Sequence, residues 1–183
     1  MSIYCSIKLT EDTQFDLYSE YPLKNKLDEI SVIFKEKNNE VCIFRDTIQE
    51  AVTTIYRGLS KCVTNQMTLN STLDIGRVGE KWNIWTNDLS DEVDEDEEDV
   101  YQQYWIWSSR DFQTWVYQKG GKSYVELSPS YRWHYLEPIE NEVVITFEEF
   151  MKGYKPIVIE ITSEKLTKVL DLLKKIKHDL GIS

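Results

Sequence analysis

The sequence predicts an α+β fold in which about three helices pack on one side of a curved, mostly antiparallel sheet. Two observations support this class. Short runs rich in β-branched and aromatic residues follow one another with turn signals between them, as antiparallel strands do. Two longer segments repeat their apolar residues every three or four positions, which is the period of an amphipathic helix. The 183 residues are enough for a real core, so we expect a single domain over residues 1–183.

The first 45 residues are expected to form four of roughly seven to nine strands, at residues 2–9, 14–23, 30–35 and 41–45. The third strand has one mainly apolar face, because Ile30, Val32 and Phe34 alternate with the residues between them. Residues 37–40 (Lys-Asn-Asn-Glu) are typical of a turn, so the third and fourth strands should form a hairpin.

A helix is expected over residues 47–64. One face is marked by apolar residues at three- and four-residue steps: Ile48, Ala51, Val52, Ile55, Leu59 and Cys62. Asp46 is the expected N-cap, and Gln49 three residues later completes a capping box. Residues 65–79 are polar and are expected to form a long loop. Residues 81–86 (Lys-Trp-Asn-Ile-Trp-Thr) should then resume as a strand.

Residues 120–121 (Gly-Gly) predict a two-residue hairpin turn between two further strands, at residues 114–119 and 122–128. If the loop contains only these glycines, the ladder pairs Tyr117 with Tyr124 and Val116 with Val125. Pro129 ends the second of these strands, and residues 131–136 are expected to form another.

The C-terminal part predicts a short helix, a strand and a long helix. Thr146 and Glu149 form a capping box for the short helix, which Gly153 closes. Residues 157–161 form a compact apolar strand. Ser163 is expected to cap the last helix, whose apolar stripe consists of Leu166, Val169, Leu170, Leu173, Ile176 and Leu180.

Residues 88–99 differ from the rest of the chain in charge. The chain has 32 acidic and 21 basic residues and a formal net charge of −11. Nine of the acids fall within these twelve residues, so the remainder holds 23 acidic and 21 basic residues, a net charge of −2. A block of like charges repels itself and cannot be buried. We therefore expect a mobile acidic insertion loop at residues 88–99.

Aromatic side chains are concentrated directly after this acidic block. Eleven of the 23 aromatic rings lie within residues 101–135. Strict alternation along a strand sends neighbouring rings to opposite faces, so some of them should be exposed and others should fill the core. Exposed rings at the start of this region would adjoin the acidic block, and a charged rim beside aromatic residues is typical of a protein–protein interface.

Several function classes are excluded by composition and motifs. A strongly acidic chain repels nucleic acid and anionic membranes, and no run approaches the ~20 apolar residues of a membrane span. Residues 1–8 show no secretory signal, so we expect a cytoplasmic protein. Cys5, Cys42 and Cys62 form no C-x-x-C motif, and His134 and His178 show no metal spacing. We expect three structural thiols, no metal and no other cofactor.

No enzyme motif is present. The chain contains no G-x-S-x-G elbow, no H-E-x-x-H helix and no recognisable Cys–His signature. His134, between two aromatic residues, is typical of a strand residue and not of a catalytic base. A carboxylate pair for glycoside hydrolysis is defined by tertiary distance, which the sequence leaves open. We therefore expect a protein that is not an enzyme.

The acidic block has three readings. As an EF-hand loop it fails, because counting from Asp94 puts Asp99 at position six, where Gly is needed, and Trp105 at position twelve, where Glu is needed. It is either a solubility loop or an anionic surface for a basic protein partner, whose encounter it would accelerate. The interpretation as an anionic surface for a basic partner predicts these partner-binding residues: Asp91, Glu92, Asp94, Glu95, Asp96, Glu97, Glu98, Asp99, Tyr101, Tyr104, Trp105 and Trp107.

A small acidic α+β chain, rich in aromatics and without a catalytic signature, resembles the immunity proteins of bacterial polymorphic-toxin and contact-dependent growth inhibition systems. The resemblance covers the full length and lies in this general character, with no diagnostic motif. It implies a cytoplasmic antitoxin that binds a cognate basic toxin domain, such as a nuclease, and covers its active site. The alternative is a module that binds carbohydrate or another small molecule on an aromatic sheet face.

Overall fold

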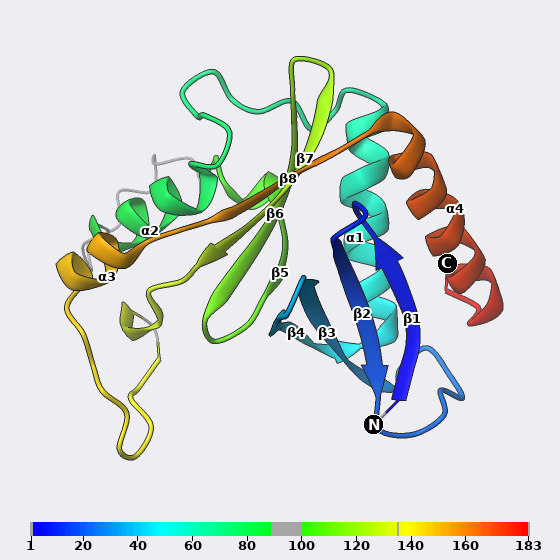
Figure 1. The fold of residues 1–183 in the computed structure, drawn as a ribbon, viewed down its shortest axis with the longest axis horizontal. Helices are drawn as coiled ribbons and strands as arrows, with labels where there is room; N and C mark the ends of the chain where they lie inside the picture. Colours follow the sequence, from blue (N-terminus) through cyan, green and yellow to red (C-terminus); the bar gives the residue numbers. More distant parts are fainter. Residues whose placement is uncertain (1, 89–99, 135, 183) are drawn as a thin grey trace.

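The computed structural model describes residues 2–88, 100–134 and 136–182. Within these ranges it contains eight strands, four α-helices and two short 3₁₀ helices (Figure 1). They follow in the order β1 (Ser2–Lys8), β2 (Thr13–Ser19), β3 (Glu29–Glu36), β4 (Asn39–Thr47), α1 (Ile48–Val63), α2 (Val78–Asp88), η1 (Gln102–Tyr104), β5 (Trp105–Ser108), β6 (Phe112–Lys119), β7 (Lys122–Pro129), η2 (Arg132–His134), α3 (Phe147–Gly153), β8 (Ile157–Ile161) and α4 (Ser163–Asp179).

The predicted α+β class and the antiparallel strand order are confirmed. The strands divide into two four-stranded sheets, which we call sheet A (β1-β2-β3-β4) and sheet B (β5-β6-β7-β8). Every pair of neighbouring strands in both sheets is antiparallel. The predicted glycine hairpin joins β6 to β7, with Tyr117 opposite Tyr124. Gly120 and Gly121 have φ angles of +61° and +76°, which a type I′ turn requires and which glycine adopts without strain.

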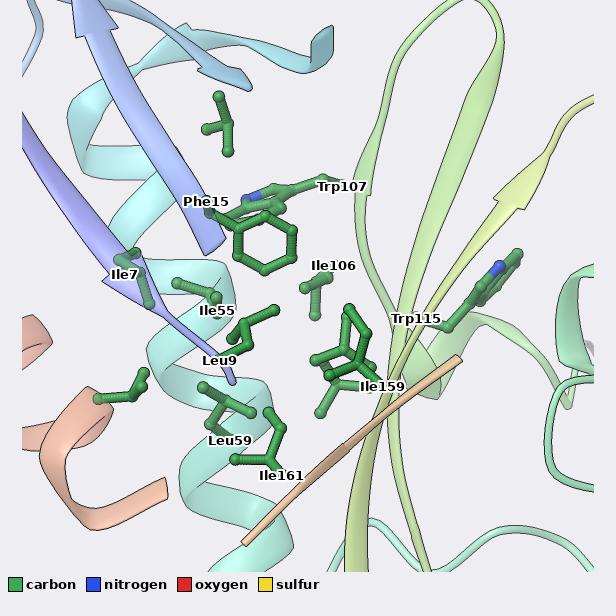
Figure 2. Packing of buried hydrophobic residues seen from close by; sticks show 14 of the residues in the cluster. Ile7, Leu9, Phe15, Ile55, Leu59, Ile106, Trp107, Trp115, Ile159 and Ile161 are labelled. Atoms are coloured by element: carbon green, nitrogen blue, oxygen red, sulfur yellow. The ribbon is translucent and has the colours of Figure 1, made fainter. Parts of the chain in front are cut away.

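Helix α1 forms the centre of the fold. It packs on strands of both sheets and on α4, which also contacts β1 (Figure 1). Apolar side chains form the core between α1 and the two sheets, and Figure 2 shows Ile55 and Leu59 of α1 among side chains from both sheets. Trp107 lies beside Phe15 in this core, whereas Trp115 lies apart from it across the strands of sheet B (Figure 2). Sheet B therefore has two covered faces, and α2 packs on the one opposite α1.

The prediction of a strand at residues 81–86 is wrong, because these residues belong to α2. Buried positions Gly79 and Asn83 are four residues apart, which is the spacing of a helix face. The side chain of Asn83 explains why these residues form a helix and not a strand. Its Nδ2 donates to the carbonyl oxygens of Gly79 and Pro129, at 2.7 and 3.0 Å, and its Oδ1 accepts from the backbone N–H of Tyr131 at 2.8 Å. These tertiary contacts favour a helix over the local strand-like pattern.

The same contact explains why residues 131–136 do not form the predicted strand. The backbone N–H of Tyr131 is committed to Asn83 and not to a sheet neighbour, and Arg132–His134 form a 3₁₀ turn. Arg132 is held there by the carboxylates of Asp111 and Glu142. Tyr135 lies outside the described residues.

Two helix caps differ from prediction by one residue each. The N-cap of α1 is Thr47 and not Asp46, since the Thr47 hydroxyl accepts from the Glu50 N–H at 3.3 Å. The N-cap of α4 is Thr162 and not Ser163, and it accepts from the Lys165 N–H. The predicted capping box between Thr146 and the third residue of α3 is confirmed.

Candidate functional site

The predicted partner-binding acids lie outside the described residues: Asp91, Glu92, Asp94, Glu95, Asp96, Glu97, Glu98 and Asp99. The chain on either side of residues 89–99 is described. Asp88 is the last residue of α2, and the chain resumes at Val100 just before η1. The rings of Trp85, in α2, and Tyr101 lie 5.7 Å apart between centroids. This contact holds the two flanks of the acidic segment together.

The four predicted aromatic residues divide between surface and core. Trp105 is 43% exposed and Tyr101 is half-buried, whereas Tyr104 and Trp107 are almost completely buried. A β-bulge between Trp105 and Trp107 explains this division. Residues two apart on a regular strand share a face, but the bulge pairs Trp105 with Trp115 on the α2 side and turns Trp107 into the central core.

Both buried rings have structural roles. Trp107 makes an edge contact with Phe15, with centroids 5.1 Å apart, and its Nε1–H donates to the Ala51 carbonyl at 3.2 Å. The Tyr104 hydroxyl accepts from the Asn70 N–H at 2.8 Å and donates to the Thr68 carbonyl at 3.1 Å. Trp107 thereby joins sheets A and B to α1, and Tyr104 fixes the loop that precedes α2. Neither ring is available to a partner.

Trp105 borders a cleft of about 210 Å³, which we call the tryptophan cleft. Three indole rings and three polar side chains line it: Trp82, Gln102, Trp105, Ser108, Gln113 and Trp115. Its residues come from α2, η1 and strands β5 and β6. The rings of Trp82 and Trp115 lie 5.8 Å apart at an interplanar angle of 56°, so two of the walls meet at an angle.

Hydrogen bonds fix the rings of the tryptophan cleft. The indole N–H of Trp105 donates to Oε1 of Gln113 at 2.8 Å, and that of Trp115 donates to the Ser128 hydroxyl at 2.8 Å. Gln113, Trp115 and Ser128 are all buried. The exposed ring of Trp105 is therefore oriented before any ligand arrives, which reduces the entropy lost on binding.

A second hollow of about 150 Å³ is also lined by Trp105 and lies against α1. Arg57 and Lys61 of α1 line this hollow together with Gln103. Trp105 thus borders one hollow lined by three indole rings and another lined by two cations of α1. A charged partner that covers Trp105 would be oriented by this difference.

The position of α2, and so of Trp82, depends on the buried carboxylate of Glu126 in β7. One oxygen accepts from the Gly79 N–H at 2.8 Å, and the other accepts from the Tyr117 hydroxyl at 2.7 Å. The Tyr117 hydroxyl in turn accepts from the Gly76 N–H at 2.8 Å. Glu126 therefore occupies the N-terminus of α2, where unpaired N–H groups and the helix dipole favour an anion.

Burial dominates the electrostatics of this cluster. It raises the pKa of Glu126 above the ordinary carboxyl range, although the Gly79 N–H and the Tyr117 hydroxyl oppose the shift. Burial and the neighbouring Glu126 carboxylate also raise the pKa of Tyr117. The cluster lies inside sheet B and α2 and makes internal hydrogen bonds, so we assign it to the support of the cleft and not to ligand binding.

Sequence reasoning missed Trp82, Gln113 and Trp115 as members of the site. A signal for α2 was present, because Val78, Trp82 and Trp85 are spaced four and then three residues apart, as on one face of a helix. The juxtaposition of α2 with β5 and β6 depends on tertiary packing and has no counterpart in the local sequence.

Comparison of the chain with protein-family models, with curated proteins and with solved structures found no match in any of the three. Among the described residues, no helix combines the length and the apolar character needed to cross a bilayer.

Proposed function

We propose that this chain is a non-enzymatic binding protein that inhibits a basic protein partner in the cytoplasm. The observation that carries the proposal is the exposed ring of Trp105, fixed by Gln113 at the edge of the tryptophan cleft. The two elements that flank residues 89–99 both contribute to this cleft, because α2 supplies Trp82 and η1 supplies Gln102. The binding surface consists of the segment and the cleft together.

The two parts of this surface have different roles. Nine acids within residues 88–99 attract a basic partner at long range and raise its association rate. Indole rings supply the short-range binding energy, since Trp is among the residues that most often dominate protein interfaces. A pre-oriented ring such as Trp105 binds with a small loss of side-chain entropy.

The resemblance to immunity proteins supports a more specific form of the proposal, in which the partner is a bacterial toxin domain. A nuclease toxin would carry a basic substrate cleft, and an acidic segment is complementary to such a cleft. Covering that cleft would block substrate access without any chemistry by the inhibitor itself.

The proposal is tested by affinity capture from the source cells with three forms of the full chain. These are the unchanged protein, Trp105→Ala, and a variant in which Glu95, Asp96, Glu97 and Glu98 are replaced by Gln or Asn. The unchanged protein should capture one basic protein, and both variants should recover several-fold less of it. Tyr21→Ala is the matched control, because Tyr21 is 74% exposed and lies outside the cleft. Equal recovery by all four forms would contradict the proposal.

The composition of the cleft also favours a second function, the binding of a carbohydrate or another small molecule. Three indole rings together with the amides of Gln102 and Gln113 offer both stacking faces and hydrogen-bonding groups. A glycan panel titrated against the intrinsic tryptophan fluorescence tests this function. If the cleft binds a glycan, the fluorescence should be quenched saturably, and Trp105→Ala should reduce the quenching. The absence of a response to every member of the panel would contradict this function.

A further inference from the structure

A second cleft, of about 380 Å³, lies on sheet A and the loop between β2 and β3. Three of its polar side chains form a row across the sheet. Tyr18 of β2 is directly opposite Ser31 of β3, and Ser31 is directly opposite Arg45 of β4. Residues paired in this way in an antiparallel sheet share one face and lie about 5 Å apart. We call this site the Tyr18–Arg45 cleft.

Internal hydrogen bonds orient the row and leave its remaining donors available. The Nε–H of Arg45 donates to the Ser31 hydroxyl oxygen at 3.3 Å, which directs the terminal nitrogens of the guanidinium away from this bond. The ammonium of Lys35 donates to the Tyr18 hydroxyl oxygen at 2.8 Å. Because both hydroxyls act as acceptors in these bonds, each keeps its own proton to donate to a ligand.

Two cations at the row, Lys35 and Arg45, differ in whether a carboxylate already forms an ion pair with them. Lys35 forms ion pairs with Asp16 and Glu40, at 3.1 and 2.8 Å. Among the described residues no carboxylate forms an ion pair with Arg45. The guanidinium therefore offers a planar fork of donors that matches a carboxylate or a phosphate.

The lining of the cleft also contains three carboxylates, which favour a carboxylate ligand over a phosphate. Asp28 is occupied, because it accepts from the backbone N–H groups of Lys24 and Asn25 at 2.5 and 3.0 Å. Glu20 and Glu29 are exposed on the same lining and would repel a doubly charged phosphate more strongly than a carboxylate. Flat apolar surface is supplied by Pro22 and by the largely exposed ring of Tyr21.

We propose that the Tyr18–Arg45 cleft binds a small aromatic monocarboxylate. Its carboxylate accepts from the free nitrogens of Arg45 and from the hydroxyls of Ser31 and Tyr18, and its ring packs on Tyr21. The cleft falls within the volume range of small-molecule sites. This site is on sheet A, whereas the tryptophan cleft is formed by sheet B and α2, so the two proposals stand or fall separately.

Titration of the full ¹⁵N-labelled chain with benzoate tests this site by NMR. We expect saturable shifts of the Arg45 Nε–H and of the amides of Tyr21 and Ser31. Arg45→Gln should weaken binding at least tenfold, and Tyr18→Phe, which removes one hydroxyl and keeps the ring, by roughly two- to tenfold. Lys175→Gln on α4 is the control and should leave binding unchanged, because it removes an exposed cation that lines none of the clefts described above. Phenyl phosphate should bind more weakly than benzoate.

Each alternative result overturns a defined part of this inference. Unsaturable shifts, or shifts that Arg45→Gln leaves intact, would show that the cleft is not a site for benzoate. Tighter binding of phenyl phosphate would overturn the assignment to monocarboxylates. Both substitutions are on an outward sheet face, and the dispersion of the remaining amide signals reports whether each variant is folded.

Discussion

At the scale of single residues, one β-bulge separates a surface ring from a core ring. Trp105 and Trp107 are two positions apart and equally aromatic, so the sequence alone predicts the same role for both. The bulge reverses the alternation between them, and only Trp105 remains 43% exposed. The presence of exposed rings beside the acidic segment was predictable from alternation, but their identity depends on a backbone irregularity that has no local signature.

This division predicts different stabilities for two alanine variants. Trp107→Ala removes a fully buried ring and its bond to Ala51, and should lower the free energy of unfolding by about 3–5 kcal/mol. Trp105→Ala should lower it by less than about 1 kcal/mol, because much of the ring already contacts water. Urea denaturation followed by circular dichroism measures both values. Equal losses would show that Trp105 is a core residue and not a surface for binding.

Glu126 predicts a pH dependence of stability. Burial raises its pKa above the ordinary value of 4.5 in the folded chain, while the unfolded chain keeps that value. Between the two pKa values only the folded chain holds the proton, so this contribution is complete below pH 4.5 and is lost as the pH rises through the folded pKa. The unfolding free energy of the unchanged protein minus that of Glu126→Gln should therefore fall as the pH is raised from 4 to 8.

Glu142 provides a control of opposite sign for this prediction. The Ile139 N–H and then Arg110 lower the pKa of Glu142, so its contribution is lost as the pH falls through the folded pKa. The corresponding difference for Glu142→Gln should rise with pH over the acid range. A difference for Glu126→Gln that is constant or increases with pH would contradict a folded-state pKa of Glu126 above its unfolded value.

At the scale of secondary-structure elements, the sequence predicts the elements that depend on local signals. It does not predict the elements that depend on tertiary contacts. The β6–β7 hairpin follows from two adjacent glycines, and α3 follows from a capping box of two side chains three positions apart in the chain. Helix α2 is different. Its face against sheet B includes Gly79 and Asn83 beside Val78 and Trp82. The side chain of Asn83 bonds to backbone groups of residues more than 45 positions away. No local pattern contains that information.

Gly79 tests the close packing of α2 on sheet B. A Cβ atom at this position would overlap the side chain of Ser128 and lie 2.9 Å from Nε1 of Trp115. Gly79→Ala should therefore lower the free energy of unfolding by roughly 2–3 kcal/mol, despite the higher helix propensity of alanine. Gly153→Ala in α3 is the matched control, because its Cβ would meet no atom within 4 Å. A neutral Gly79→Ala in thermal or chemical unfolding would contradict the position of α2.

At the scale of the whole molecule, most of the net negative charge lies within residues 88–99, and the rest of the chain is nearly neutral. This separation was readable from composition alone, since nine of 32 acids occupy twelve consecutive residues. The sequence did not show that the two elements flanking residues 89–99, α2 and η1, both line a cleft of three tryptophans. That arrangement depends on α2 as a helix and on the contact between Trp85 and Tyr101. In the proposed function, long-range charge attraction by residues 88–99 and short-range contact with the tryptophan cleft act on the same partner.

The measurement that tests this account most directly is the association rate of the captured basic partner as a function of salt, followed by stopped-flow tryptophan fluorescence. For the unchanged chain the rate should fall steeply as salt is raised, because added ions screen the attraction. The Gln/Asn variant of Glu95, Asp96, Glu97 and Glu98 should associate more slowly at low salt and with a flatter dependence. A control that removes four charges elsewhere, at Glu140, Glu148, Glu164 and Asp171, should change the rate much less. The same rate and salt dependence for the unchanged chain and the first variant would contradict steering by the acidic segment.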